Sequence, residues 1–239
     1  RKGQTVQLNG FEEYVYDGRD RFAPPDGKLM VTSGAFKLIE TFWKSYEDET
    51  AEEVKEFCMG GPAGTGKSCA AKILATDIVR RLPEAQVFYY RQWYSEDGPF
   101  VHTAAKTSAQ SGKKTFVIAD QIKSDSSAVK LGALASQIDL WVVEVASANI
   151  PHFTRVEEGS SHRKKSIFFE FSGDDDDCTN LSALMSVKVD ESKWKRLCKW
   201  TNNHLLSLAI FLRTDASNWD SKKRALVHET AQLMSRFCK

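Results

Sequence analysis

One stretch of the chain combines the residue types that hold a phosphate group. Residues 61–68 read GPAGTGKS and fit the pattern G-x-x-x-x-G-K-[ST]. Glycines in such a loop let the backbone turn successive N–H groups inward, where they surround an anion. We expect phosphate contacts from this loop and from the residue that follows it, namely Gly61, Pro62, Ala63, Gly64, Thr65, Gly66, Lys67, Ser68 and Cys69.

Two side chains of this loop have distinct expected roles. Lys67 would reach the outer phosphates of a nucleoside triphosphate, and Ser68 would ligate Mg²⁺ through its hydroxyl group. The alternative is a tight strand-to-helix turn with an incidental lysine. The flanks favour the phosphate loop, because an apolar strand pattern (55–60) precedes it and a helical pattern (66–82) follows it.

A carboxylate suited to the same metal follows further along the chain. The apolar run TFVIAD (115–120) ends in Asp120. Ligands bind at the carboxyl ends of strands in open parallel sheets, and an aspartate placed there holds Mg²⁺ in many nucleotide-binding proteins. The alternative is an aspartate that only opens a turn. Ser68 and Asp120 together form the expected metal site.

The segments around these motifs predict an α/β fold with a parallel sheet. Five short apolar runs have the pattern of strands covered on both faces: 55–60, 86–91, 115–120, 140–146 and 166–171. Helical patterns occur at 34–46, 66–82 and 126–138, and all patterns after residue 172 are helical. The expected division is an N-terminal segment (1–50), a sheet domain (51–173) and a helical lid (174–239).

The composition narrows the range of functions. The 239 residues are 41% hydrophobic and 27% charged, with a net charge of +1, so no global charge points to nucleic acid or to a membrane surface. No apolar run is long enough to span a bilayer. The five cysteines are scattered and form neither a zinc nor a disulfide pattern. We expect a protein of a reducing compartment, the cytoplasm or the nucleus.

The order of the motifs resembles the AAA-plus and STAND branch of P-loop ATPases. A full strand-and-helix unit (86–110) lies between the two motif strands, and in that branch an extra strand sits between them. The resemblance implies a parallel five-stranded αβα P-loop NTPase sandwich followed by a small helical lid, with ATP and Mg²⁺ as ligands. It also implies that Asn149, after the fourth strand, orients the attacking water. A turn asparagine that merely closes the strand is an equal alternative.

Three more positions take their expected roles from the same resemblance. Gly18 and Arg19 in YVYDGRDRF (14–22) look like the G-R motif that packs near adenine in STAND ATPases, and a plain surface loop is the alternative. Gln121 follows Asp120 at a place where this branch usually has a glutamate that polarises water. A glutamine can orient water through its carbonyl group but accepts a proton poorly, so we expect slow hydrolysis.

Three local details make the resemblance narrower. The segments GPAGTGKSC, VIADQI and ASAN together look like the ATPase domain of Crinkler effectors and of the retrotransposon-hot-spot proteins of trypanosomes. For a Crinkler this implies a secreted protein that acts inside a host cell, often in the nucleus. We expect neither a secretion leader nor a nuclease-like or kinase-like extra domain in this sequence. The effector assignment therefore depends on the ATPase core alone.

Charged clusters in the second half have competing interpretations. DDDDC (174–178) could bind a metal, but consecutive aspartates point in different directions, so we expect them to complement the N-terminus of the next helix. The basic segments HRKK (162–165) and KWKRLCKW (193–200) could contact nucleic acid. A solvated loop and an amphipathic helix are the preferred interpretations.

The leading hypothesis is Mg-dependent ATP binding and slow ATP hydrolysis, with Lys67, Asp120, Gln121 and Asn149 as the catalytic residues. One alternative is a nucleotide-gated module that closes on ATP, hydrolyses little and binds a partner protein or a second copy through the lid. A small-molecule phosphotransferase ranks last, because no second substrate site can be found in the sequence. No membrane partner is expected.

Overall fold

The computed structural model of the chain describes residues 5–7, 12–15, 28–47, 56–62, 64–91, 98–122, 140–146, 164–168, 173–185, 187–214 and 218–224. The chain forms two compact units, Arg1–Phe171 and Ser172–Lys239. The first unit contains every strand of the described residues, and the described part of the second unit is helical.

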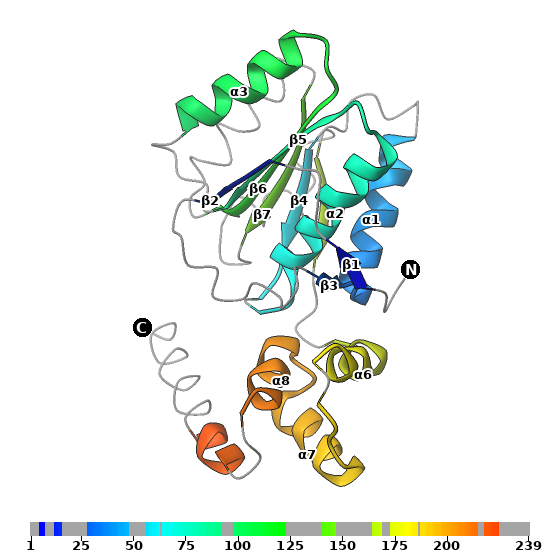
Figure 1. Cartoon of the computed structure of the whole chain (residues 1–239), viewed down its shortest axis with the longest axis vertical. Helices are drawn as coiled ribbons and strands as arrows, with labels where there is room; N and C mark the ends of the chain where they lie inside the picture. Colours follow the sequence, from blue (N-terminus) through cyan, green and yellow to red (C-terminus); the bar gives the residue numbers. More distant parts are fainter. Residues whose placement is uncertain are drawn as a thin grey trace. The chain divides into compact units, whose positions relative to one another are not determined.

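A six-stranded sheet forms the centre of the first unit (Figure 1). Its strands are β2 (Glu12–Val15), β4 (Glu56–Gly60), β5 (Gln86–Arg91), β6 (Thr115–Ile122), β7 (Leu140–Ala146) and β8 (Lys164–Phe168). They lie in the order β2-β5-β6-β7-β4-β8, and every neighbouring pair is parallel. The predicted α/β class with a parallel sheet is confirmed.

The expected number of five strands is wrong, because β2 adds a sixth. Its residues read EEYV and lack the continuous apolar run of a strand buried on both faces. Within the part of the chain that the structure describes, β2 lies at the edge of the sheet and pairs only with β5, which explains why the apolar pattern did not reveal it. A separate antiparallel pair, β1 (Thr5–Gln7) and β3 (Lys28–Met30), was not predicted either. Strand β8 begins at Lys164, two residues before the predicted start of the last strand, and the predicted end of that strand lies outside the described residues.

The sheet order separates the two strands that carry the motifs. β4 leads into the loop 61–68, β6 contains Asp120, and β7 lies between them. The strand of the unit 86–110, which lies between the motif strands in the sequence, does not lie between them in the sheet, because β5 is on the other side of β6. The carboxyl ends of β4, β7 and β6 therefore lie at one edge of the sheet, since all three strands are parallel.

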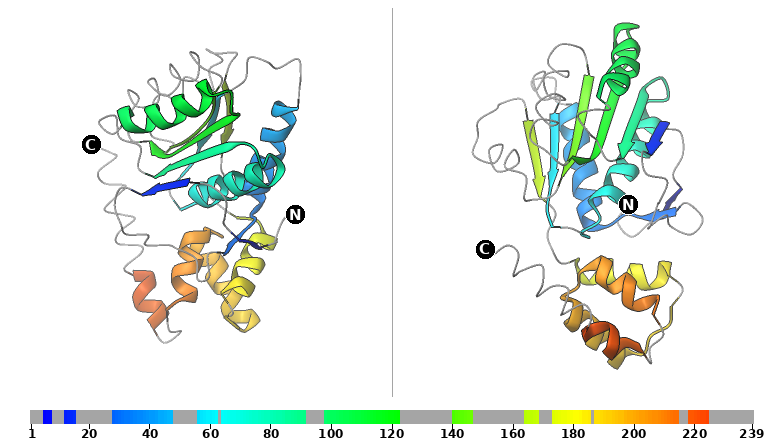
Figure 2. Two further views of the ribbon diagram at one scale, coloured as in Figure 1. Left: turned by 45° about the horizontal axis from the view of Figure 1, so that its top comes forward. Right: turned by 90° about the vertical axis from the view of Figure 1, so that its left-hand side faces the viewer.

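Helices cover both faces of the sheet. The connection from β4 through α2 (Lys67–Arg81) to β5 runs along the sheet in one direction, and the connection from β5 through α3 (Gly98–Gln110) to β6 runs back. Because such crossovers are right-handed, α2 and α3 lie on opposite faces. Helix α1 (Ser33–Tyr46) packs beside α2, on the far side of the sheet from α3 (Figures 1 and 2).

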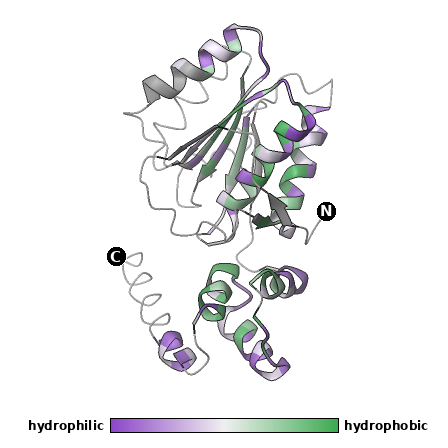
Figure 3. Cartoon of the chain, viewed as in Figure 1, coloured by the Kyte–Doolittle hydropathy of each residue, from purple (hydrophilic) through white to green (hydrophobic). Residues whose placement is uncertain are grey.

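The main core lies between the sheet and the pair α1 and α2. Alternate strand residues face it, because successive side chains of a strand point to opposite sides. Burial of one large apolar side chain stabilises the fold by about 1.5–3 kcal/mol, and the strands that Figure 3 colours are predominantly hydrophobic. The residues that the six-stranded sheet contributes to this core are Phe57, Met59, Val87, Tyr89, Phe116, Ile118, Val143 and Val145.

Helix α1 is fixed at its start and along its length. The Thr32 hydroxyl accepts a hydrogen bond from the backbone N–H of Ala35 at 3.2 Å and so caps the helix. Apolar residues at three- and four-residue intervals give the helix its buried face. The indole N–H of Trp43 donates to Asp77 Oδ2 of α2 at 2.7 Å, inside the protein. This bond joins α1 to the helix that carries Lys67 and Ser68.

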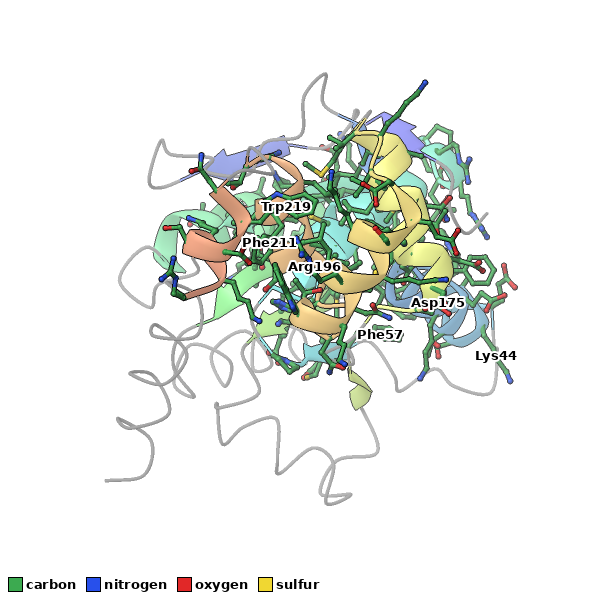
Figure 4. All side chains as sticks on the ribbon, turned by 90° about the horizontal axis from the view of Figure 1, so that it is seen from below. Lys44, Phe57, Asp175, Arg196, Phe211 and Trp219 are labelled. Carbon is green, nitrogen blue, oxygen red and sulfur yellow. The ribbon has the colours of Figure 1, made fainter. Side chains whose placement is uncertain are left out.

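The second unit contains α6 (Asp175–Leu184), α7 (Glu191–Thr201), α8 (Leu205–Leu212) and a helical stretch at 218–224. Its core includes Leu197, Phe211 and Trp219, and the Trp219 indole N–H donates to the Phe211 carbonyl at 3.1 Å (Figure 4). Asp174 caps α6 by accepting from the backbone N–H of Asp177 at 2.7 Å. The predicted role of the aspartates at a helix N-terminus is confirmed, and the described residues contain no cluster of His, Cys, Asp and Glu that could hold a metal.

None of the helices that the structure describes is long and apolar enough to cross a membrane. The predicted helices at 34–46 and 66–82 are confirmed as α1 and α2. The helix predicted at 126–138 lies outside the described residues.

Candidate phosphate and metal site

The loop between β4 and α2 has the backbone conformation that an anion nest requires. Gly64 and Gly66 have φ angles of 80° and 88°, a region that side chains rarely adopt. The Thr65 hydroxyl donates to the Pro62 carbonyl at 3.0 Å and fixes the turn between them. The glycines of the motif are therefore needed for the shape of the loop, as expected from their freedom of backbone rotation.

Helix α2 begins without a side-chain cap. Gly66 occupies its N-cap position and offers no side chain, whereas Thr32 caps α1 and Asp174 and Asp190 cap α6 and α7. The first turn of α2 also contains no acidic residue. The positive end of this 15-residue helix is thus available to an anion, and a helix N-terminus of this kind binds phosphate through its backbone N–H groups.

The Lys67 side chain folds back over the loop. Its ammonium group donates to the carbonyl oxygen of Gly61 at 2.7 Å and to that of Pro62 at 2.6 Å. Burial lowers the pKa of Lys67 to about 8, and the nearby carboxylate of Asp120 opposes this shift. The ammonium group therefore lies at the phosphate loop, bonded to two neutral carbonyl groups that a phosphate oxygen could replace.

The side chains of Ser68 in α2 and Asp120 in β6 are hydrogen-bonded to each other. The Ser68 hydroxyl, in the first turn of α2, donates to Asp120 Oδ1 at 3.0 Å. Asp120 lies in β6 and is only 1% exposed. The predicted pair of metal ligands is thus brought together from two elements that are far apart in the sequence.

A tyrosine holds the second oxygen of the same carboxylate. The hydroxyl of Tyr89, in β5, donates to Asp120 Oδ2 at 2.7 Å. Tyr89 is fully buried, and its hydroxyl is also 3.5 Å from the Ser68 carbonyl oxygen. The two oxygens of Asp120 therefore have different neighbours: Oδ1 faces the start of α2, and Oδ2 faces β5.

The donor set at this place suits Mg²⁺. A hydroxyl oxygen and a carboxylate oxygen lie 3.0 Å apart beside an uncapped helix N-terminus, and Mg²⁺ prefers hard oxygen ligands completed by water and phosphate oxygens. With the metal bound, Ser68 and Asp120 would supply the protein oxygens, and Lys67 would lie on the phosphate side.

Several predicted site residues are not placed here. Gly18, Arg19, Ala63 and Asn149 lie outside the described residues. Gln121 belongs to β6, directly after Asp120, and only its backbone is described. Their expected roles stay predictions.

The sequence analysis did not identify Tyr89 as a site residue. Alternation along β5 places it on the same face as Val87, toward α2, and a buried tyrosine hydroxyl needs a polar partner. That requirement was the available signal, but the sequence alone does not show that β5 pairs with β6, nor that the partner is Asp120. A second unexpected pair lies in β4 and β7, where the Cys58 thiol donates to Glu144 Oε2 at 3.1 Å.

Comparison with known proteins gives little further guidance. No protein-family model and no curated protein matches the chain. Among solved structures it is similar to the FIGL-1 AAA domain in complex with ADP, with 15% identity and a TM-score of 0.49. The match covers 71% of this chain and 64% of that one, so the chain spans less than two thirds of the length of the solved protein.

Proposed function

We propose that this chain is a P-loop ATPase domain of the AAA-plus or STAND type, which binds Mg·ATP and hydrolyses it slowly. The observation that carries the proposal is the hydrogen bond between Ser68 and Asp120, because it brings the end of the glycine-rich loop to the carboxylate of a strand two places away in the sheet. An incidental turn with a lysine does not require such a partner.

Each residue of the site has a role in this proposal. The N–H groups at the start of α2 and the Lys67 ammonium group bind the phosphate oxygens and stabilise the charge that develops on them. Bound Mg²⁺ would neutralise phosphate charge, with Ser68 and Asp120 as its protein ligands. Gln121 and Asn149 are the proposed residues that orient the attacking water, and Gly18 and Arg19 are proposed to lie near adenine.

The main alternative is a nucleotide-gated binding module with little hydrolysis. The same phosphate site would serve it, and its partner would bind the helical second unit. A Crinkler-type effector domain is the narrower form of the ATPase proposal, and the motifs GPAGTGKSC, VIADQI and ASAN are its support.

The test measures ATP binding by calorimetry and phosphate release under single-turnover conditions, with the parent chain and Lys67→Ala. We expect Lys67→Ala to weaken Mg·ATP binding by about 10- to 100-fold, since a hydrogen bond to a charged group contributes about 1.5–3 kcal/mol. The matched control is Lys37→Ala, which removes an exposed lysine of α1. Equal affinities of Lys67→Ala and the parent would contradict the phosphate site, and binding without phosphate release would favour the module.

A further inference from the structure

Asp120 is held from two sides in an environment that excludes water. Its side chain is 1% exposed, and it receives one bond from the Ser68 hydroxyl and one from the Tyr89 hydroxyl. A buried carboxylate is costly unless its oxygens accept hydrogen bonds. The bond from Tyr89 is therefore one of the contacts that allow a carboxylate to lie at this depth.

A bound metal would affect the hydrogen bonds from Ser68 and from Tyr89 to Asp120 in different ways. Ser68 is itself an expected ligand, so its hydroxyl would turn from Asp120 Oδ1 toward the metal. Tyr89 lies on the next strand, with its ring in the core between the sheet and α2. Its bond to Oδ2 does not compete with a metal at Oδ1, and it can persist when the metal binds.

We propose that Tyr89 is a positioning residue for the metal site: its hydroxyl holds Asp120 Oδ2 so that Oδ1 points toward Ser68 and the phosphate loop. This inference depends on the proposed nucleotide-binding function. Substitution of a residue that hydrogen-bonds to a metal ligand typically reduces metal affinity by about 10- to 100-fold. The rigid ring and the short bond of 2.7 Å make Tyr89 suited to that role.

The experiment compares nucleotide affinity with and without the metal. The affinity for ADP is measured in excess Mg²⁺ and in EDTA, and the ratio of the two affinities reports the contribution of the metal. Tyr89→Phe removes the hydroxyl and keeps the buried ring, so we expect this ratio to fall by about 10-fold while the affinity in EDTA stays unchanged. Tyr90→Phe is the matched control, because Tyr90 is the next residue of β5 and lies on the opposite face of the sheet.

The outcomes separate the two proposals. If the parent binds neither ATP nor ADP, the proposed function fails. If the parent shows the metal effect and Tyr89→Phe shows the same ratio, only the inference on Tyr89 is overturned. A parallel loss of affinity in Mg²⁺ and in EDTA would also overturn it, because that result indicates a general change of the core rather than of the metal site.

Two further measurements test the link to Asp120. In an Asp120→Asn background, Tyr89→Phe should have no additional effect on the ratio, because residues that act through one another are not additive. In the parent chain labelled with ¹³C-tyrosine, adding Mg²⁺ to the ADP complex should shift the ring signal of Tyr89 and leave that of Tyr90 in place. Additive effects would contradict the proposal. A Tyr89 signal unmoved by Mg²⁺ would contradict it even if Tyr89→Phe did not fold, because that measurement uses the parent chain.

Discussion

At the scale of single residues, we expect Lys67 to make the proposed nucleotide binding depend on pH. Its pKa of about 8 in the free protein means that the neutral amine prevails above that pH. A bound phosphate favours the ammonium form and raises the pKa, so binding above about pH 8 takes up a proton. We expect ADP affinity to fall as pH rises through about 8, by at most tenfold per pH unit.

Calorimetry in buffers of different ionisation enthalpy measures this proton uptake directly. Lys67→Arg is the control, because a guanidinium group stays charged throughout this range. Its affinity for ADP should be flat with pH whatever its absolute value. The same slope in Lys67→Arg and in the parent would show that another group is responsible.

Gln121 is the residue for which we expect an effect on hydrolysis without an effect on binding. It follows Asp120 in β6, and it has a neutral amide in place of a carboxylate that could accept a proton. We expect a basal rate below about 1 s⁻¹, the lower end of ordinary enzyme turnover. Gln121→Ala should slow phosphate release further at saturating ATP and leave ATP affinity unchanged. If Gln121→Ala releases phosphate as fast as the parent, another residue orients the water, and Asn149 is the first to test.

At the scale of elements, the contact between α1 and α2 stabilises the helix that starts at the phosphate loop. Asp77 accepts a buried hydrogen bond from the indole N–H of Trp43. It also forms salt bridges with Arg80 and with Arg81, whose Nε lies 3.0 Å from the carboxylate. Asp77→Ala leaves the indole N–H of Trp43 without this acceptor, so we expect the free energy of unfolding to fall by about 1–3 kcal/mol. Denaturant unfolding measures the loss.

The control for Asp77→Ala is Glu40→Ala, an exposed acidic residue of α1. Glu40→Ala should change stability by no more than about 0.5 kcal/mol. ADP affinity of the folded Asp77→Ala protein should match the parent, because Asp77 lies in the interior of α2, away from its first turn. A large loss of affinity in Asp77→Ala without a loss of stability would contradict a purely structural role for this cluster.

The strands that could be predicted from the sequence are those that are buried on both faces of the sheet. Strands β5 and β7 were predicted with their observed bounds, and β6 was predicted two residues short, because buried parallel strands form continuous apolar runs. β2 was missed because an edge strand does not need such a run. Likewise Ser68 and Asp120 belong to recognisable motifs, whereas Tyr89 matters only through the pairing of β5 with β6. Contacts set by pairing cannot be found from local patterns.

At the scale of the whole molecule, charge sets the limit on interactions with nucleic acid. The net charge is +1, so attraction to a phosphate backbone must come from local clusters. The basic helix α7 is partly neutralised by its own acidic residues, because Lys193 pairs with Asp190 at 3.1 Å and Lys195 with Glu191 at 2.6 Å. Arg196 lies over the ring of Trp200, with its guanidinium carbon 4.7 Å from the ring centre.

From these charges we expect weak binding to duplex DNA that depends strongly on salt. Two or three phosphate contacts would make the affinity fall by about 10- to 40-fold between roughly 50 and 200 mM salt, since each contact releases about one counterion. Fluorescence anisotropy of a labelled duplex over this range measures the slope of log K against log salt. Arg196→Ala should reduce that slope by about 1 if the guanidinium group binds a phosphate, and Lys37→Ala on α1 is the charge-matched control. Duplex DNA binding with a nanomolar dissociation constant that persists at about 0.5 M salt would contradict the expectation. Screening at that ionic strength removes most of the attraction between exposed charges. Such binding would instead require a surface that recognises DNA through contacts other than charge.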